Sequence, residues 1–265
     1  MKKVIVPLDF SDTSNNALDF AIQFANEFDA SIQGIHVYKI DASQVGNSSN
    51  IQEYMNISEN KLNQIVDKKK ISEDISLDAK LLVGFPGDKI LTYAKELDNS
   101  CVVLGTHGEK DVLRNLFGSV STKVGMDCDK PVWVIPPDAK FSEFKKIAFC
   151  TNDPLAAVSA SEVLYPISNK YKSEVHLLNV FEFSDINKEE IINAWSKIIP
   201  KEKIKIKTLY DIDIVDALYK YCQENDIDLI VINRKQRSFL SMLFNKSITK
   251  KMIIKSDIPL LIMHS

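Results

Sequence analysis

The chain has 265 residues, a length that favours two domains of ordinary size. Its apolar content of 45% and charged content of 26% are typical of a globular protein and argue against an intrinsically disordered one. The formal net charge of −3 provides no general positive field for nucleic acid, and no apolar run approaches the ~20 residues that a membrane-spanning helix needs. We therefore expect a cytoplasmic protein that binds neither nucleic acid nor membrane.

The first half of the chain alternates short apolar runs with segments of helical periodicity. The β-branched run at residues 4–8 predicts a strand, and Ser11, Asp12 and Thr13 follow it as helix-capping residues. Further strands are predicted at residues 31–38, 77–83, 101–104 and 131–135. Helices are predicted at 13–28, across the apolar positions from 51 to 66, from Pro86 and from Val120.

The four cysteines and four histidines predict neither a disulfide framework nor a metal site. The cysteines are widely spaced, form no C-x-x-C pair and include two at strand ends; they are Cys101, Cys128, Cys150 and Cys222. We interpret them as small, buried and reduced core residues. The N-terminal apolar run stops at Pro7, which makes it too short for the core of a signal peptide.

The stretch LGTHGEKDVLRNLFGSVS, residues 104–121, carries the strongest functional signal. Gly105 and Gly108 directly follow an apolar strand, and Gly118 and Ser119 directly precede a predicted helix. A strand that ends in glycines and leads to a helix N-terminus offers unpaired N–H groups and a positive dipole end to an anion, most often phosphate. The first two glycines alone would fit an ordinary turn. The full spacing, with glycines that let the backbone approach a ligand, is more restrictive.

The spacing Gly-x2-Gly-x9-Gly-Ser between two apolar strands resembles the nucleotide-binding signature of the universal stress protein family. The resemblance extends to VPLDFSD at residues 6–12, IHVY at 35–38 and GFPGDKI at 84–90, in family order. It implies an ATP site. The residues at the matching positions are Pro7, Asp9, Val37, Leu104, Gly105, His107, Gly108, Gly118, Ser119, Val120 and Ser121.

The resemblance also implies roles for these residues. Asp9 would lie beside the adenosine part of the nucleotide, where a plain helix-flanking acid is the alternative. Pro7, Val37 and Leu104 are apolar strand ends that the family pattern places around the base. His107 would donate to phosphate or lie in an exposed turn. The hydroxyl groups of Ser119 and Ser121 would bind phosphate, cap the helix, or do both.

Strands that alternate with helices imply right-handed crossovers and a mostly parallel sheet. Ligands of such sheets bind at the carboxyl ends of the strands, at the switch point between neighbours whose helices cover opposite faces. Asp9 follows the first predicted strand and Gly105 follows the fourth. We therefore expect these two residues to face one crevice.

The second half of the chain repeats the first. Its strands are predicted at residues 146–150, 174–181, 204–209, 229–232 and 258–263, and its helices at 154–171, 213–225 and 247–254. The stretch LFNKSITKK aligns with LFGSVSTKV at an offset of 127. We predict two tandem Rossmann-like α/β domains, at residues 1–138 and 144–265, each a five-stranded parallel sheet with helices on both faces. The resemblance makes this fold adenine nucleotide alpha hydrolase-like.

The second copy lacks the glycines of the motif. In the same register Gly105 becomes Ile232, Gly108 becomes Lys235, Gly118 becomes Asn245 and Ser119 becomes Lys246, while Asp9 faces Asn152. Side chains would then fill the space that the first copy leaves for phosphates. We expect the second copy to be closed to a nucleotide.

The resemblance implies a stress-response regulator that uses ATP as a ligand. It also implies that the two halves form an internal pseudo-dimer, and a homodimer of two chains is a further alternative. The alternatives are a slow ATPase or phosphotransferase and a scaffold that binds no nucleotide. The sequence has no GxxxxGK[ST] motif and no carboxylate placed as a general base beyond Asp9, so we assign no catalytic residue. We assign no resident metal, and Mg²⁺ would enter only with ATP, as a bridge from the phosphates to Asp9 or a serine.

Overall fold

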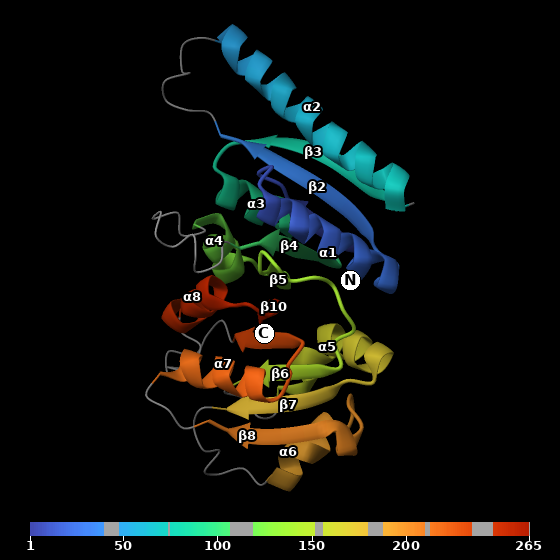
Figure 1. The fold of residues 1–265 in the computed structure, drawn as a ribbon, viewed down its shortest axis with the longest axis vertical. Helices are drawn as coiled ribbons and strands as arrows, with labels where there is room; N and C mark the ends of the chain where they lie inside the picture. Colours follow the sequence, from blue (N-terminus) through green and yellow to red (C-terminus); the bar gives the residue numbers. More distant parts are fainter. Residues whose placement is uncertain are drawn as a thin grey trace. The chain divides into compact units, whose positions relative to one another are not determined.

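The computed structural model describes residues 1–39, 48–73, 75–106, 119–151, 156–179, 188–209, 213–234 and 246–264. The chain divides into two compact units, Met1–Phe141 and Ser142–Ser265. Each unit alternates strands and helices and builds a parallel sheet, as Figure 1 shows. The predicted α/β fold class is confirmed.

The first unit has five parallel strands in the order β3-β2-β1-β4-β5. They are β1 (Lys3–Pro7), β2 (Ser31–Tyr38), β3 (Leu77–Val83), β4 (Ser100–Gly105) and β5 (Val132–Ile135). The connecting helices are α1 (Asp12–Phe28), α2 (Ser48–Glu73), α3 (Pro86–Lys95) and α4 (Ser119–Asp127). Because the order runs outward from β1 in both directions, the switch point lies between β1 and β4.

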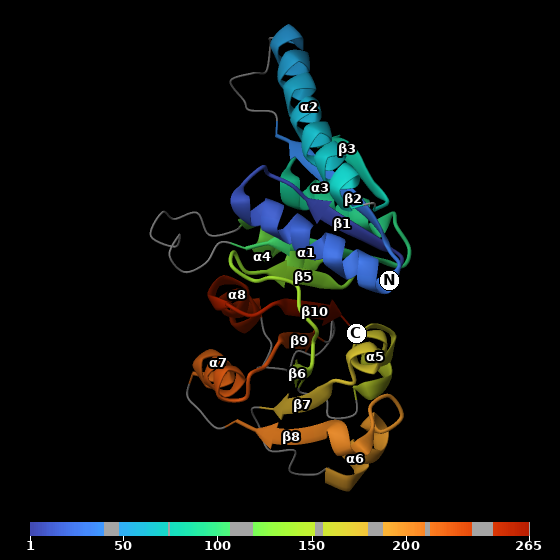
Figure 2. The ribbon, with the colours of Figure 1, turned by 45° about the vertical axis from the view of Figure 1, so that its right-hand side comes forward.

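Right-handed crossovers place α1 and α2 on one face of this sheet and α3 and α4 on the other. Figure 2 shows α1 and α2 on the same side. Local sequence explains the ends of α1: the Ser11 Oγ accepts a hydrogen bond from the Ser14 N–H at 3.2 Å, and Asp29 ends the helix in the left-handed conformation. Between these ends Ala17, Ala21 and Phe24 are buried against the sheet.

The core of the first unit joins α1 to β5 through aromatic rings. The Trp133 side chain is fully buried, and its ring lies 5.0 Å from Phe24 and 6.0 Å from Phe20, measured between centroids. Phe141, the last residue of the unit, packs edge-on against Phe20 at 5.2 Å. The segment after β5 is therefore anchored on α1, and Trp133 is a core residue of this unit.

Asn16 of α1 binds the same segment after β5 with hydrogen bonds and so holds it against the helix. Its Nδ2 donates to the carbonyl oxygens of Pro136 at 3.1 Å and Ala139 at 2.9 Å, and its Oδ1 accepts from the Lys140 Nζ at 2.7 Å. The Asn16 side chain is buried, with 8% of its surface exposed. A buried amide with three partners specifies one path for the chain after β5.

The second unit repeats the topology, with the order β10-β9-β6-β7-β8. Its strands are β6 (Lys146–Cys150), β7 (Glu174–Asn179), β8 (Ile204–Thr208), β9 (Leu229–Arg234) and β10 (Leu260–His264). Its helices are α5 (Ala157–Tyr171), α6 (Lys188–Trp195), α7 (Ile214–Glu224) and α8 (Lys246–Lys255), with a short 3-10 turn at Lys201–Lys203. The sequence analysis did not predict α6.

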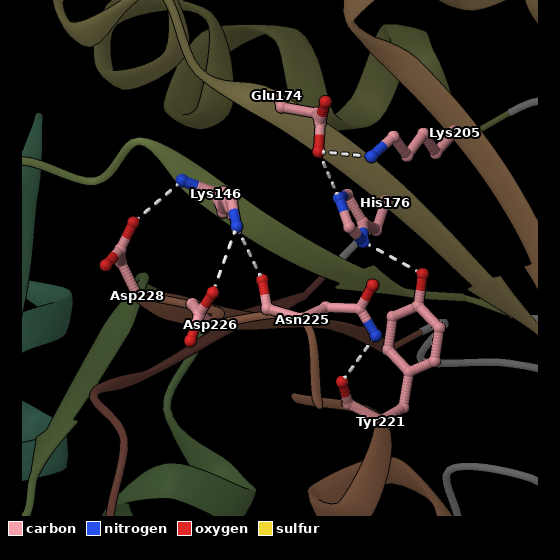
Figure 3. A network of polar contacts seen from close by, with 8 residues as sticks. All are labelled: Lys146, Glu174, His176, Lys205, Tyr221, Asn225, Asp226 and Asp228. Atoms are coloured by element: carbon pink, nitrogen blue, oxygen red, sulfur yellow. Dashed lines mark hydrogen bonds and ion pairs between the residues drawn. The ribbon is translucent and has the colours of Figure 1, made fainter. Parts of the chain in front are cut away.

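A polar network at the amino-terminal edge of the second sheet surrounds His176, which is 1% exposed (Figure 3). The His176 Nε2 lies 2.6 Å from a Glu174 carboxylate oxygen and its Nδ1 lies 2.9 Å from the Tyr221 hydroxyl. Burial opposes ionisation of Glu174, but hydrogen bonds from Lys205 and His176 outweigh it and hold the pKa of this carboxyl below its usual value. The network lies opposite the edge where parallel sheets bind ligands, so we interpret it as structural.

The four cysteines are buried and unpaired, as predicted. Burial raises the pKa of Cys101 to about 12, which keeps its thiol protonated and unreactive. Within the described ranges no cluster of histidine, cysteine or acidic side chains could hold a metal ion. The described helices include none with the length and apolar character to cross a membrane.

Replacing Asn16 with alanine should destabilise the first unit by about 1–3 kcal/mol, because two carbonyl groups and an ammonium group lose their buried partner. The matched control is Asn26→Ala, since Asn26 lies on the same helix and is exposed. Urea unfolding of both variants measures the difference. Equal effects of the two substitutions would show that the Asn16 contacts contribute nothing specific.

Candidate functional site

The carboxyl ends of β1 and β4 form the candidate site. The two strands pair in parallel, with Lys3 opposite Ser100 and Ile5 opposite Val102, so their ends lie side by side. Pro7 ends β1, and Leu104 and Gly105 end β4. The structure thus brings three of the predicted residues to one edge of the sheet. Their contact with a nucleotide stays a prediction.

Val37 lies one residue before the end of β2, which pairs with β1. Its side chain is 9% exposed, and Leu104 is 3% exposed. These residues are apolar ends of neighbouring strands, as the sequence pattern indicated. They lie on the two strands that flank β1.

Ser121 ties the start of α4 to the end of β4. Its Oγ donates a hydrogen bond to the Gly105 carbonyl oxygen at 2.8 Å, and its side chain is 7% exposed. The hydroxyl proton is therefore donated to the end of β4 and is not available to a phosphate oxygen. The helix begins at Ser119, next to the predicted start at Val120, and β4 ends at Gly105, so the strand end and the helix start on either side of the predicted motif are both present.

Gly105 has a packing reason to be glycine. A Cβ atom at this position would lie 2.5 Å from the Thr13 carbonyl oxygen and 2.8 Å from the Thr13 carbonyl carbon, both in the first turn of α1. Backbone atoms at such distances cannot move aside as a flexible side chain can. The glycine motif predicts that Gly105 allows the backbone to approach a ligand. The structure shows that the approach of α1 already excludes any side chain here.

Asp9 lies in the turn between β1 and α1, and its side chain is exposed. Its Oδ1 accepts hydrogen bonds from the Ser11 N–H, at 3.0 Å, and from the Ser11 Oγ. The same Ser11 caps α1. The carboxylate is thus fixed to the turn through Oδ1, at the edge where β1 and β4 end.

For most of the other predicted site residues the structure describes little or nothing. His107, Gly108 and Gly118 lie outside the described residues, and of Ser119 only the backbone, as the first residue of α4, is described. Val120 lies in the first turn of α4 and is half-buried. Their roles stay predictions from the resemblance.

A stack of side chains beside Asp9 is not predicted by the sequence pattern. The Phe10 ring stacks on the His36 ring with centroids 4.2 Å apart, and the Nζ of Lys61, on α2, lies 4.5 Å from the Phe10 centroid. The stretch IHVY, which includes His36, was noticed as part of the resemblance, but nothing in its pattern indicates what the imidazole contacts.

The strand pairing corrects the predicted correspondence between the two units. The Val102 N–H donates to the Pro131 carbonyl at 2.9 Å, and the Ile230 N–H donates to the Pro259 carbonyl at 3.0 Å. Val102 therefore corresponds to Ile230, and Gly105 corresponds to Asn233. The predicted counterpart Ile232 is wrong, because Ile232 occupies the place of Leu104. The offset of 127 holds for the stretch LFNKSITKK but is one residue short for the strands.

The other predicted counterparts lie mostly beyond the described ranges. Asn152, Lys235 and Asn245 are outside them, and Lys246 is the first residue of α8. Asn233 is 2% exposed and has a Cβ where the first unit has none. The shift of the strand register by one residue thus makes the counterpart of Gly105 a buried asparagine, Asn233, instead of the predicted Ile232.

The helices that come after the first strand of each unit can be aligned by their C-terminal ends. Both α1 and α5 end with a left-handed residue, Asp29 and Lys172, which aligns Ala157 with Ser14. In this register Ala156, with φ of −67° and ψ of 9°, takes the place of Thr13, and the four residues before it lie outside the described ranges.

Comparisons with known proteins agree with the fold and with the family resemblance. The family model described as "Universal stress protein family" matches residues 1–136. Two universal stress proteins of Methanocaldococcus jannaschii are similar to this chain. One is 31% identical over 147 residues, which is 52% of this chain and 84% of the relative. The other is 28% identical over 154 residues, which is 51% of this chain and 94% of the relative.

A solved structure extends the likeness along the whole chain. The crystal structure of a universal stress protein from Archaeoglobus fulgidus superposes with a TM-score of 0.74 and covers 99% of this chain and 96% of its own. At 19% identity this likeness concerns the fold alone. The family model and the first relative rest on sequence, and they cover the part of the chain that contains the candidate site. The chain therefore belongs to the universal stress protein family.

Proposed function

We propose that the first unit binds ATP at the carboxyl edge of its sheet, and that the chain is a cytoplasmic stress-response regulator that uses ATP as a ligand. The observation that carries the proposal is the hydrogen bond from the Ser121 Oγ to the Gly105 carbonyl oxygen. It holds the N-terminus of α4 at the end of β4, beside the switch point of the sheet. A helix start in this place suits an anion.

The arrangement offers different chemistry to the two parts of a nucleotide. The first N–H groups of α4 and its dipole favour phosphate oxygens, whose negative charge they stabilise. On the other side of the switch point, the Asp9 carboxylate is an acceptor for sugar hydroxyl groups. The apolar side chains of Val37 and Leu104 suit the faces of a base. Mg²⁺ would enter with the phosphates, because the described residues offer it no cluster of ligands.

The enzyme alternative needs a general base at the phosphates. Asp9 is the carboxylate at this edge that the sequence offered for such a role, and its Oδ1 already accepts two hydrogen bonds from Ser11. A carboxylate fixed in this way is better suited to orient a ligand than to accept a proton. This favours ATP as a ligand over ATP as a substrate.

Replacing Gly118 with valine should lower ATP affinity at least tenfold, ~1.4 kcal/mol, because a branched side chain would occupy the place where phosphate approaches the backbone. Asn245→Val, at the matching position of LFNKSITKK, is the control and should leave the affinity unchanged. Calorimetric titration with ATP measures both. Unchanged ATP affinity in a folded Gly118→Val protein would contradict the assignment of the glycine motif to phosphate binding.

Each chain should bind one ATP. In the second unit Asn245 and Lys246 take the places of Gly118 and Ser119, and the buried Asn233 takes the place of Gly105. The stoichiometry of the same titration tests this. Two ATP per chain, or loss of binding on replacing Lys246 but not Gly118, would mean that the working and degenerate halves are assigned the wrong way round.

Steady-state hydrolysis of ATP should be far slower than the ~10 per second of a typical enzyme, because the carboxylate described at this edge, Asp9, has its Oδ1 engaged by Ser11. A phosphate-release assay with purified protein and Mg²⁺ measures the rate. Turnover near that typical value, abolished by Asp9→Asn, would make the ATPase the better account.

A further inference from the structure

His36 contacts the chain on both sides of Asp9. Its Nδ1 lies 2.6 Å from the carbonyl oxygen of Leu8, the residue before Asp9. Because a carbonyl oxygen only accepts, the Nδ1 must carry the proton and donate it. The His36 ring also stacks on Phe10, the residue after Asp9, with an interplanar angle of 24°. One side chain of β2 thus holds both neighbours of the predicted nucleotide contact.

The backbone of the turn needs such support. Phe10 has a φ of 69°, in the left-handed region that a bulky residue rarely adopts. Its ring lies between the His36 imidazole and the Lys61 ammonium group of α2, whose positive charge is attracted to the ring. Contacts from two elements therefore favour a backbone conformation that the isolated turn would disfavour.

The second unit has neither ring at the matching places. The Leu8 N–H donates to the Ile35 carbonyl and the Thr151 N–H donates to the Leu178 carbonyl, so His36 corresponds to Asn179. The same register aligns Phe10 with Asp153. The stack is therefore present in the unit that has the glycine motif and missing from the unit that has lost it. A merely structural contact of the fold would have no reason to follow the motif.

We propose that His36 and Phe10 are positioning residues that fix the backbone at Asp9 for contact with the nucleotide. This inference rests on the proposed ATP site. His36 acts through the Leu8 carbonyl and the Phe10 ring, and Lys61 contributes from the outer face of that ring. Removing the imidazole releases the turn on both sides of Asp9 while leaving the carboxylate in the chain.

A double-mutant cycle with ATP titration tests the coupling. His36→Ala should lower ATP affinity about tenfold, similar to Asp9→Ala, and the double variant should lose no more than Asp9→Ala alone. A fold-loss of ATP affinity in the double variant equal to the product of the two single fold-losses would overturn the inference, because it would show that His36 does not act through Asp9. Should His36→Ala fail to fold, Phe10→Leu takes its place, and Phe10→Tyr, which keeps the ring, should bind as the wild type does.

Lys61→Ala should weaken binding less than His36→Ala does, since it removes only the outer contact. Its control is Lys80→Ala, because the Lys80 Nζ also lies 4.5 Å from an aromatic ring, that of Tyr93, away from Asp9. Lys80→Ala should not change ATP affinity. Equal losses from both lysine variants would contradict the inference.

A measurement without nucleotide separates this inference from the proposed function. The Ser11 amide donates to the Asp9 Oδ1, so its hydrogen exchange reports the order of the turn. Exchange followed by NMR should be faster in His36→Ala than in the wild type and unchanged in Lys80→Ala. Equal exchange in His36→Ala and wild type would overturn the inference. Failure of the wild type to bind ATP would overturn the proposed function and the role toward the nucleotide that rests on it, whereas the exchange result would still decide whether His36 orders the turn at Asp9.

Discussion

The contact between Gly105 and the Thr13 carbonyl sets the geometry of the first unit's carboxyl edge. An added Cβ would come within 2.5 Å of that oxygen, so α1 can begin where it does only because β4 ends in glycine. The turn that carries Asp9 leads directly into α1, and the Ser121 hydroxyl attaches α4 to the same Gly105. The two helix starts and the acidic turn are therefore placed relative to one strand end.

The second unit has different residues at the matching places of its carboxyl edge. Asn233 occupies the place of Gly105, and Asn179 and Asp153 occupy the places of His36 and Phe10, so the aromatic stack has no counterpart there. The sheet itself is unchanged, since its order and pairing match those of the first unit. The fold is supported by buried strands, which tolerate these changes. The site depends on a few close contacts, which change together.

Local patterns predicted most of the fold. Runs rich in β-branched residues, bounded by glycine, proline or capping residues, indicated the strands, and Ser11 indicated the start of α1. The helix α6 was missed, and β9 is two residues longer than predicted, because the ends of elements are set by packing as well as by periodicity. The offset of 127 in the second motif was applied to strands whose own spacing differs by one residue. Two contacts could not be predicted because they join residues distant in sequence and follow no local period. They are the close approach of Gly105 to the Thr13 backbone and the hydrogen bond from His36 to the Leu8 carbonyl oxygen, next to Asp9.

The central claim is that an adenine nucleotide binds at the carboxyl edge of the first unit, and photolabelling tests it directly. An azido-adenine analogue of ATP is cross-linked to the full chain, and the labelled peptides are mapped by mass spectrometry with and without excess ATP. We predict labelling that ATP suppresses in peptides containing Val37 or Leu104, within the region that the family model matches. Labelling that ATP does not suppress, or that is confined to residues 142–265, would contradict the account.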